Sequence, residues 1–251
     1  MTHKSRRPAK PAARHRAARR GSRTVGAAKK QTRQRLTHGK RERAIVEEAV
    51  RFFAECGFRG NTRELARRLG ITQPLLYRYF PNKRALIERV YEEVFIGRWN
   101  PAWESWLGDR TRPLAERLVT FYQDYTRTIM HHDWIRLFLF SGLEGIEINR
   151  RYTKMMRDRI WSKVIAELRH ASGRPPLDQE PASETEIDLV WALIASIFYI
   201  GVRRWVFGLA VPRDLDAVVE DKIKGFLEGA PAAIAAPAKG RGVRRQPIAD
   251  L

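Results

Sequence analysis

The sequence predicts an all-α fold, in which a three-helix helix-turn-helix domain at residues 39–86 precedes a larger helical domain at residues 87–230. Three observations predict it. Apolar residues recur at helical spacing through most of the chain. Residues 87–230 contain no convincing strand pattern. Residues 57–86 contain two short helical patterns joined at a glycine. A chain of 251 residues is long enough for one small and one medium domain.

The first helix is predicted over residues 41–56, because Ile45, Ala49 and Phe52 recur at helical spacing. Cys56, the only cysteine, lies on the apolar side of this helix and is expected to be a buried thiol. A single cysteine forms no internal disulfide, which suits a reducing cytoplasm. Arg43, near the start of the helix, is either solvated or in contact with nucleic acid, and the sequence favours neither interpretation.

Two short helices joined by a tight turn follow. The predicted helix starts carry N-capping side chains at Asn61, Thr72 and Asn82. Glu64 is expected to close a capping box with the first of these caps. Gly70 supplies the left-handed stop, Pro74 occupies the first turn of the next helix, and Pro81 ends that helix. A helix-turn-helix of this kind can lay its second helix in the major groove of DNA.

These residues resemble the DNA-binding domain of the tetracycline-repressor (TetR) family of bacterial transcription regulators. The resemblance is carried by Gly57-Phe58, Glu64-Leu65-Ala66, Gly70-Ile71-Thr72, Leu76-Tyr77-Arg78-Tyr79-Phe80-Pro81-Asn82-Lys83 and Ala85-Leu86. It covers about fifty residues, roughly 40–86. The link between Phe58 and Glu64 is one residue shorter than the family pattern, so Asn61 and Thr62 both remain candidates for the cap.

Eleven residues are candidates for contact with double-stranded DNA: Arg41, Arg43, Thr62, Arg63, Thr72, Gln73, Pro74, Tyr77, Arg78, Tyr79 and Lys83. Gln73 is the best candidate for reading a base, because its side-chain amide can form two hydrogen bonds with the edge of an adenine. The resemblance implies phosphate contacts for Tyr77, Tyr79 and Lys83, with Arg78 nearby. Tyr79 is alternatively a core residue. Phosphate contacts carry no sequence information, so these residues do not reveal the operator.

The second domain reads as successive helices, over about 82–96, 113–131, 133–142, 147–170, 184–209 and 215–227. Asp133 is the expected N-cap of the third of these. Residues 97–112 are expected to be irregular, and the Pro-rich stretch 171–183 an exposed loop. This layout is typical of an all-helical domain that binds an effector and dimerises.

Aromatic residues and one methionine on internal helices are candidates for an effector pocket, although each is alternatively ordinary core. They are Phe121, Tyr125, Trp134, Phe138, Met155, Trp161, Trp191 and Tyr199. A small apolar or aromatic effector is favoured. The resemblance implies a homodimer through about residues 184–228. The candidates for its interface are Leu193, Ile197, Phe198, Ile200, Trp205 and Phe207. The sequence does not show which of them contact the second copy and which lie in the core of one copy.

Several classes of function are disfavoured. The charge-free run at 189–202 is 14 residues, and a membrane span needs about 20. The sequence contains no Gly-rich phosphate loop, no GxSxG and no clustered Cys/His spacing. We therefore expect neither an enzyme nor a catalytic, cofactor or metal site, and no membrane insertion.

The charge is uneven along the chain. Residues 1–40 contain 14 Lys and Arg and no acidic residue, although the whole chain has a net charge of +20. Residues 1–38 are therefore predicted to be a disordered basic arm, and residues 231–251 a disordered basic tail. The helix-turn-helix predicts a DNA-binding transcription regulator. The resemblance implies that it acts in the bacterial cytoplasm and nucleoid, as a ligand-released homodimeric repressor on a near-palindromic operator. The alternative is an architectural protein that uses the arm for sequence-independent binding.

Overall fold

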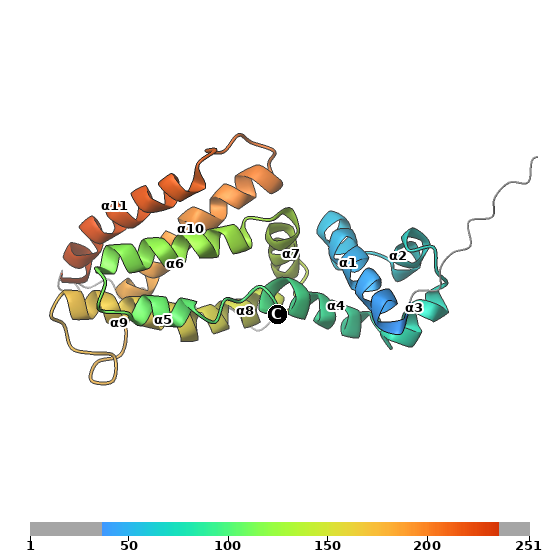
Figure 1. Ribbon diagram of the computed structural model, residues 1–251, viewed down its shortest axis with the longest axis horizontal. Helices are drawn as coiled ribbons and strands as arrows, with labels where there is room; N and C mark the ends of the chain where they lie inside the picture. The colour runs from blue at the N-terminus through green and yellow to red at the C-terminus, as the bar shows by residue number, and fades with distance from the viewer. Residues whose placement is uncertain (1–36, 236–251) are drawn as a thin grey trace, which may run out of the picture. The chain divides into compact units, whose positions relative to one another are not determined.

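The computed structural model describes residues 37–235, and this part of the chain is helical and contains no strand (Figure 1). The predicted all-α class is therefore confirmed. Most of the predicted arm and tail, residues 1–36 and 236–251, lies outside the described residues. The α-helices are α1 (His38–Cys56), α2 (Thr62–Arg68), α3 (Gln73–Tyr79), α4 (Lys83–Tyr91), α5 (Trp103–Gly108), α6 (Leu114–Ile129), α7 (His132–Leu143), α8 (Ile148–Met156), α9 (Ser162–Ala171), α10 (Glu184–Trp205) and α11 (Leu215–Ala235).

Two of the predicted helices are continuous helical segments with a π-helical turn. The turn Glu92–Ile96 continues α4, and the turn Arg157–Trp161 joins α8 to α9. A π-helical turn inserts one residue into the helical period and re-aims the residues after it. Periodicity over 82–96 and 147–170 therefore predicts the helices correctly but not the direction of every side chain.

The segment 97–112 is not wholly irregular, because it contains α5. Trp103 on this helix is fully buried, and its indole Nε1 donates to Asp124 Oδ2 on α6 at 2.7 Å. A helix of six residues is too short for apolar residues to recur at helical spacing, so the sequence does not predict it. The buried Trp103 holds it in place. The expectation of an irregular segment was wrong for these six residues.

Asp133 is not the N-cap of α7. The helix begins at His132 with His131 as its N-cap, and no side chain caps it. Asp133 lies in the first turn, where it accepts a hydrogen bond from Arg98. A carboxylate in the first turn also interacts favourably with the helix dipole, so Asp133 stabilises the start of the helix from a position two residues after the N-cap.

The end of α11 and the thiol of Cys56 also differ from expectation. The helix α11 runs past residue 227 to Ala235 and contains Pro231. Cys56 is exposed, although its thiol donates to the carbonyl of Phe52 at 3.1 Å. Cys56 is the last residue of α1, and its neighbours Phe53 and Ala54 occupy the buried positions at this end of the helix.

The helix α10 carries the most apolar sequence of the second domain. Within the described residues it is the one helix long and apolar enough to cross a membrane by length and composition. The core helix of a soluble protein satisfies the same criterion, and 39% of the relevant stretch is buried inside this protein. Val190, Ile197 and Ile200 from α10 lie in the core against α6, α7, α9 and α11.

A buried ion pair joins α9 to the start of α10. Arg169 donates from Nε and Nη2 to the two carboxylate oxygens of Glu186, each at 2.6 Å, and both side chains are fully buried. Arg169 also donates to the carbonyl oxygens of Pro175 and Pro181 in the intervening loop, and Glu186 completes a capping box with Ser183. Burial alone would raise the pKa of Glu186, but the hydrogen bonds from Arg169 and Ser183 outweigh it and lower the pKa to about 2.

The substitution Arg169→Met is expected to lower the free energy of unfolding by about 3–5 kcal/mol, because it leaves the Glu186 carboxylate buried without its partner. Urea unfolding at neutral pH measures this loss. The double variant Arg169→Met/Glu186→Leu is the control, and it should recover most of the stability because no unpaired charge remains. A loss below about 1 kcal/mol for Arg169→Met would show that Glu186 finds another partner.

The same pair predicts an acid dependence. Glu186 has a pKa of about 2 in the folded protein against 4.5 as its ordinary value. It therefore contributes roughly 3 kcal/mol of stability above pH 5, which is lost as pH falls toward 2. The double variant should lose correspondingly less stability over this range.

Candidate nucleic-acid interface and effector cavity

The three predicted N-caps of the first domain are confirmed. The side-chain oxygens of Asn61, Thr72 and Asn82 accept hydrogen bonds from backbone N–H groups two or three residues further on, at 2.8, 3.3 and 2.8 Å. Thr62, the other candidate for the first cap, is instead the first residue of α2. These caps fix where α2, α3 and α4 begin, because each satisfies an N–H that the helix leaves unpaired.

The predicted capping box at Asn61 is wrong. Glu64 does not reach back to the cap, because its carboxylate binds Arg67 at 2.7 Å and lies 3.6 Å from Arg68. The guanidinium of Arg67, one turn further along the helix, binds both carboxylate oxygens of Glu64. It therefore competes for the carboxylate better than a single backbone N–H does. The sequence pattern of a capping box does not reveal such a competitor.

The turn between α2 and α3 is tight. Gly70 has a φ of 61°, and the N–H of Ile71 bonds the carbonyl of Ala66 at 3.0 Å. A left-handed residue after the helix end favours glycine, because other residues meet a steric penalty there. Leu65 of α2 and Leu76 of α3 are buried on either side of the turn, so the two helices are held as one unit.

Thr62 ties α3 to the start of α2. Its Oγ1 accepts a hydrogen bond from Gln73 Nε2 at 3.0 Å and shares another with Tyr77 Oη at 2.9 Å. Thr62 is 6% exposed, whereas Tyr77 is 37% exposed. Two candidate contact residues of α3 are thus positioned by one buried hydroxyl, and the structure places Thr62 under the surface rather than on it.

The other candidates differ in exposure. Six are exposed: Arg43, Arg63, Thr72, Pro74, Tyr77 and Arg78. Four are partly buried: Arg41, Gln73, Tyr79 and Lys83. The ring of Tyr79 packs on the imidazole of His38 with centroids 4.5 Å apart. His38 was missed as a candidate because the contact joins residues 41 positions apart, and no local pattern records it.

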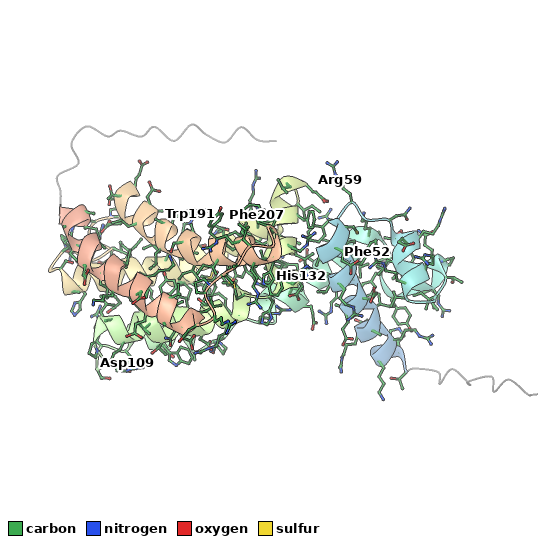
Figure 2. All side chains as sticks on the ribbon, turned by 90° about the horizontal axis from the view of Figure 1, so that it is seen from above. Phe52, Arg59, Asp109, His132, Trp191 and Phe207 are labelled. Carbon is green, nitrogen blue, oxygen red and sulfur yellow. The ribbon has the colours of Figure 1, made fainter. Side chains whose placement is uncertain are left out.

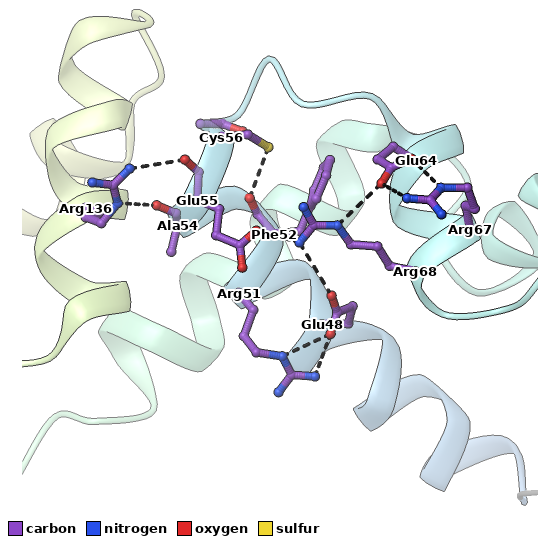
Figure 3. Close-up of polar contacts among 11 residues, drawn as sticks. Glu48, Arg51, Phe52, Ala54, Glu55, Cys56, Glu64, Arg67, Arg68 and Arg136 are labelled. Atoms are coloured by element: carbon purple, nitrogen blue, oxygen red, sulfur yellow. Dashed lines mark hydrogen bonds and ion pairs between the residues drawn. The ribbon is translucent and has the colours of Figure 1, made fainter.

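The cations of the first domain fall into two groups. Arg51, Arg67 and Arg68 each bind a carboxylate on α1 or α2, and Figure 3 shows Arg68 reaching between Glu48 and Glu64. The candidate cations have no carboxylate partner within residues 37–235: Arg41, Arg43, Arg63, Arg78 and Lys83. Unpaired cations beside α3 can bind phosphate without first breaking an ion pair within the protein.

A cavity of about 260 Å³ lies in the second domain, between α6, α7, α8 and α10. Five of the eight predicted residues line it: Tyr125, Trp134, Phe138, Trp161 and Trp191. Six further lining residues were not predicted: Tyr152, Thr153, Met156, Ile194, Ala195 and Phe198.

The remaining three predicted residues lie away from the cavity lining. Phe121 is fully buried and packs on Trp103 with ring centroids 5.7 Å apart. Met155 is the neighbour of the lining residue Met156, so that prediction missed by one position. Tyr199 is 53% exposed on α10. Core, cavity and surface aromatics are not distinguishable from hydropathy alone.

The helix α7 contacts both the cavity and the first domain. Trp134 and Phe138 line the cavity. Arg136, from the same helix, donates to the carbonyl oxygens of Ala54 and Glu55 at the end of α1 (Figure 3). A Cβ added at Gly57 would meet the carboxylate of Glu144, just after α7, and would lie 3.1 Å from the ring of Phe140, so glycine leaves this space to the two side chains.

A family model described as bacterial regulatory proteins of the tetR family matches residues 45–90, which cover α2, α3 and most of α1 and α4. Residues 45–90 therefore form a DNA-binding domain of the TetR type. The matched segment contains the capped helix-turn-helix described above, so the resemblance drawn from the sequence is confirmed.

Curated relatives and solved structures extend the comparison. The class A tetracycline repressor protein of Escherichia coli is 34% identical over 91 residues, covering 33% of this chain and 42% of the repressor. The class C repressor of Escherichia coli is 42% identical over 52 residues, covering 20% of this chain and 24% of the repressor. The chain thus matches less than half the length of these relatives. A TetR-like transcriptional regulator from Rhodococcus sp. RHA1 shares the fold with a TM-score of 0.55 at 17% identity, over 79% of this chain and 99% of the other.

The substitution Thr62→Val is expected to loosen α3 without unfolding the domain. Valine fills the same volume but removes the hydroxyl that binds Gln73 and Tyr77, and each lost hydrogen bond costs about 1 kcal/mol. Hydrogen exchange of the α3 backbone amides should therefore accelerate by roughly 10-fold to 30-fold. Thr126→Val is the matched control, because that hydroxyl is equally buried and donates to the Tyr122 carbonyl of its own helix. Unchanged exchange in α3 would mean that Thr62 does not position it.

Proposed function

We propose that this chain is a sequence-specific transcription regulator of the bacterial cytoplasm, a homodimeric repressor that a small ligand releases from a near-palindromic operator. The observation that carries the proposal is the surface around α3. It presents unpaired cations, a capped N-terminus and an amide held by a buried hydroxyl. An α-helix presented in this way fits the major groove of B-DNA.

Five of the candidate residues have a proposed role. Gln73 reads a base edge, since its Nε2 has two hydrogens and donates only one of them to Thr62. Tyr77, Arg78 and Lys83 contact phosphates on either side of the groove. Arg43, at the exposed start of α1, contacts the flanking backbone. Phosphate contacts fix the register of the helix, and the base contact then selects the sequence.

The proposed dimer interface is the outer face of α10. Trp191, Ala192, Ala195 and Tyr199 are all exposed, and their spacing of three and four residues places them along one side of the helix. Figure 2 shows Trp191 on α10 and Phe207, which is 54% exposed, just beyond its end. An apolar stripe of this length is typical of a helix that packs against a second copy.

Three of the residues considered for the interface belong to the core of one copy instead. Leu193, Ile197 and Ile200 are at most 5% exposed. They lie on the opposite side of α10 from Ala192 and Tyr199. A second copy is proposed as the occupant of the outer face because a two-fold-related pair of α3 helices matches two half-sites one helical turn apart.

The proposed release step passes through α7. A ligand in the cavity contacts Trp134 and Phe138, and displacement of α7 carries Arg136 and the end of α1 with it. The two α3 helices of a dimer would then lose the spacing of successive major grooves. Thermodynamic linkage requires that operator DNA weaken ligand binding by the same factor by which the ligand weakens DNA binding.

A footprint on DNA upstream of the gene at about 0.2 M salt is the test of specific binding. We expect a discrete, two-fold-symmetric protected site, with the whole chain and with a version beginning at Thr37. Gln73→Ala should relax base preference at one position in each half-site. Lys83→Ala should weaken all sequences alike and reduce the salt dependence, because it removes one phosphate contact.

Two outcomes would contradict the proposal. Diffuse protection, or protection that disappears without residues 1–36, would favour the architectural alternative in which the basic arm binds any sequence. An unchanged preferred motif with Gln73→Ala would show that another residue reads the base.

The dimer prediction is tested with Ala192→Arg, which places a charge in the centre of the outer face of α10. Sedimentation should show a monomer, since a buried arginine without a partner costs several kcal/mol in the interface. Ala115→Arg, on the exposed surface of α6, is the matched control and should leave the dimer intact. A dimer that persists with Ala192→Arg would place the interface elsewhere.

A further inference from the structure

Three side chains of the helix-turn-helix form one continuous chain of hydrogen bonds. Gln73, the first residue of α3, donates from Nε2 to Thr62 Oγ1 at 3.0 Å, and Thr62 Oγ1 lies 2.9 Å from Tyr77 Oη. Thr62 is 6% exposed, whereas Tyr77 is 37% exposed. The chain therefore runs from the amide at the start of α3, through a buried hydroxyl, to a phenol that reaches solvent.

The direction of these hydrogen bonds follows from the single hydrogen of the threonine hydroxyl. Such a hydroxyl has one hydrogen to donate and two lone pairs that accept. One lone pair accepts from Gln73, and within residues 37–235 the hydroxyl has no partner besides Gln73 and Tyr77. If Tyr77 also donated to it, the hydrogen of a buried hydroxyl would have no acceptor, which is unfavourable. Thr62 therefore donates to Tyr77 Oη, and the phenol keeps its own hydrogen for an acceptor outside the protein.

The same direction fixes the amide of Gln73. Because its Nε2 is bound to Thr62, Oε1 and one N–H remain for a base. In the major groove adenine presents a donor at N6 and an acceptor at N7, which match these two groups. Guanine presents two acceptors, O6 and N7, so Oε1 of Gln73 would meet a second oxygen. The amide as it lies in the structure thus favours adenine over guanine.

A second arrangement reverses every hydrogen bond. When the amide of Gln73 is rotated by half a turn, Thr62 donates to its Oε1 and Tyr77 donates to Thr62. The phenol then has no hydrogen left for a phosphate oxygen, which only accepts. Both hydrogens of Gln73 Nε2 are free in this arrangement, and they match the two acceptors of guanine. The two arrangements therefore differ at the phosphate and at the base together.

We propose that the phosphate contact of Tyr77 selects the base that Gln73 reads, through the buried hydroxyl of Thr62. A phosphate oxygen that accepts from the phenol holds the hydrogen bonds in the direction Gln73 to Thr62 to Tyr77, and this direction makes Gln73 specific for adenine. The inference rests on the proposed function, because it requires α3 to lie in the major groove. A phosphate contact ordinarily carries no sequence information. This one decides which groups of the amide face the base.

Selection of bound duplexes from a pool of random double-stranded DNA, followed by sequencing, tests the proposal without a known operator. The selection uses the whole chain at about 0.2 M salt, where non-specific binding is weak. A parallel selection with Gln73→Ala identifies the position of the motif that Gln73 reads. At this position the unmodified chain is expected to prefer adenine over guanine by roughly 5-fold to 150-fold.

The variant Tyr77→Phe keeps the ring and removes the hydroxyl. The hydrogen of Thr62 then finds an acceptor only at Gln73 Oε1, so the amide rotates and its two N–H groups face the base. The preference for adenine over guanine is expected to fall by at least about 10-fold, besides a loss of affinity for every sequence. Tyr79→Phe is the matched control, because its hydroxyl lies on the same helix and has no hydrogen bond within residues 37–235. It should leave the preference unchanged.

Three results would overturn the proposal. The first is a base other than adenine at the position that Gln73 reads in the unmodified chain. The second is an unchanged preference with Tyr77→Phe, since a phosphate contact that acts alone weakens all sequences alike. The third is a pool without any enriched motif, which would overturn the proposed function as well. Failure of this inference alone therefore leaves a motif, whereas failure of the proposed function leaves none.

Discussion

The contact between α1 and α7 is the constraint on which the rest of this structure depends. Arg136 binds the two carbonyl oxygens that end α1, and Gly57 leaves space there for the side chains of Glu144 and Phe140. The last carbonyls of a helix carry partial negative charge and have no partner within the helix, so a guanidinium satisfies them well. The DNA-binding domain is therefore attached through the helix whose other residues line the cavity.

Charged residues in this chain have two physical roles. Inside the second domain they close buried networks, as in the Arg169–Glu186 pair and in the Arg117–Glu167 pair at 2.8 Å. Such pairs contribute little net stability but are costly to break, and they fix where a loop and a helix start. Around α3 the cations have no carboxylate partner among the described residues. Their charge is not neutralised within the protein and is available to an anionic polymer.

Much of this structure follows from local chemistry. The caps at Asn61, Thr72 and Asn82, the glycine turn and the long helices were predicted, because each depends on residues within one or two turns. The predictions that were wrong depended on distant partners. Asp133 binds Arg98, 35 residues away, and α5 is held by its Trp103, whose indole donates to Asp124 on α6. Glu64 is the exception, because it was predicted to close a capping box at Asn61 and instead binds Arg67, three residues further along the same helix.

The sequence by itself determined the helical class, the helix-turn-helix and the TetR type of that domain, since helix periodicity and capping are local properties of the chain. Only the tertiary structure decided which aromatic residues line a cavity, which fill the core and which face solvent on α10. It also decided that Thr62 is a buried positioning residue rather than a surface contact. The physical reason is that hydropathy measures how strongly a side chain avoids water, whereas its role depends on which other segments the fold brings against it.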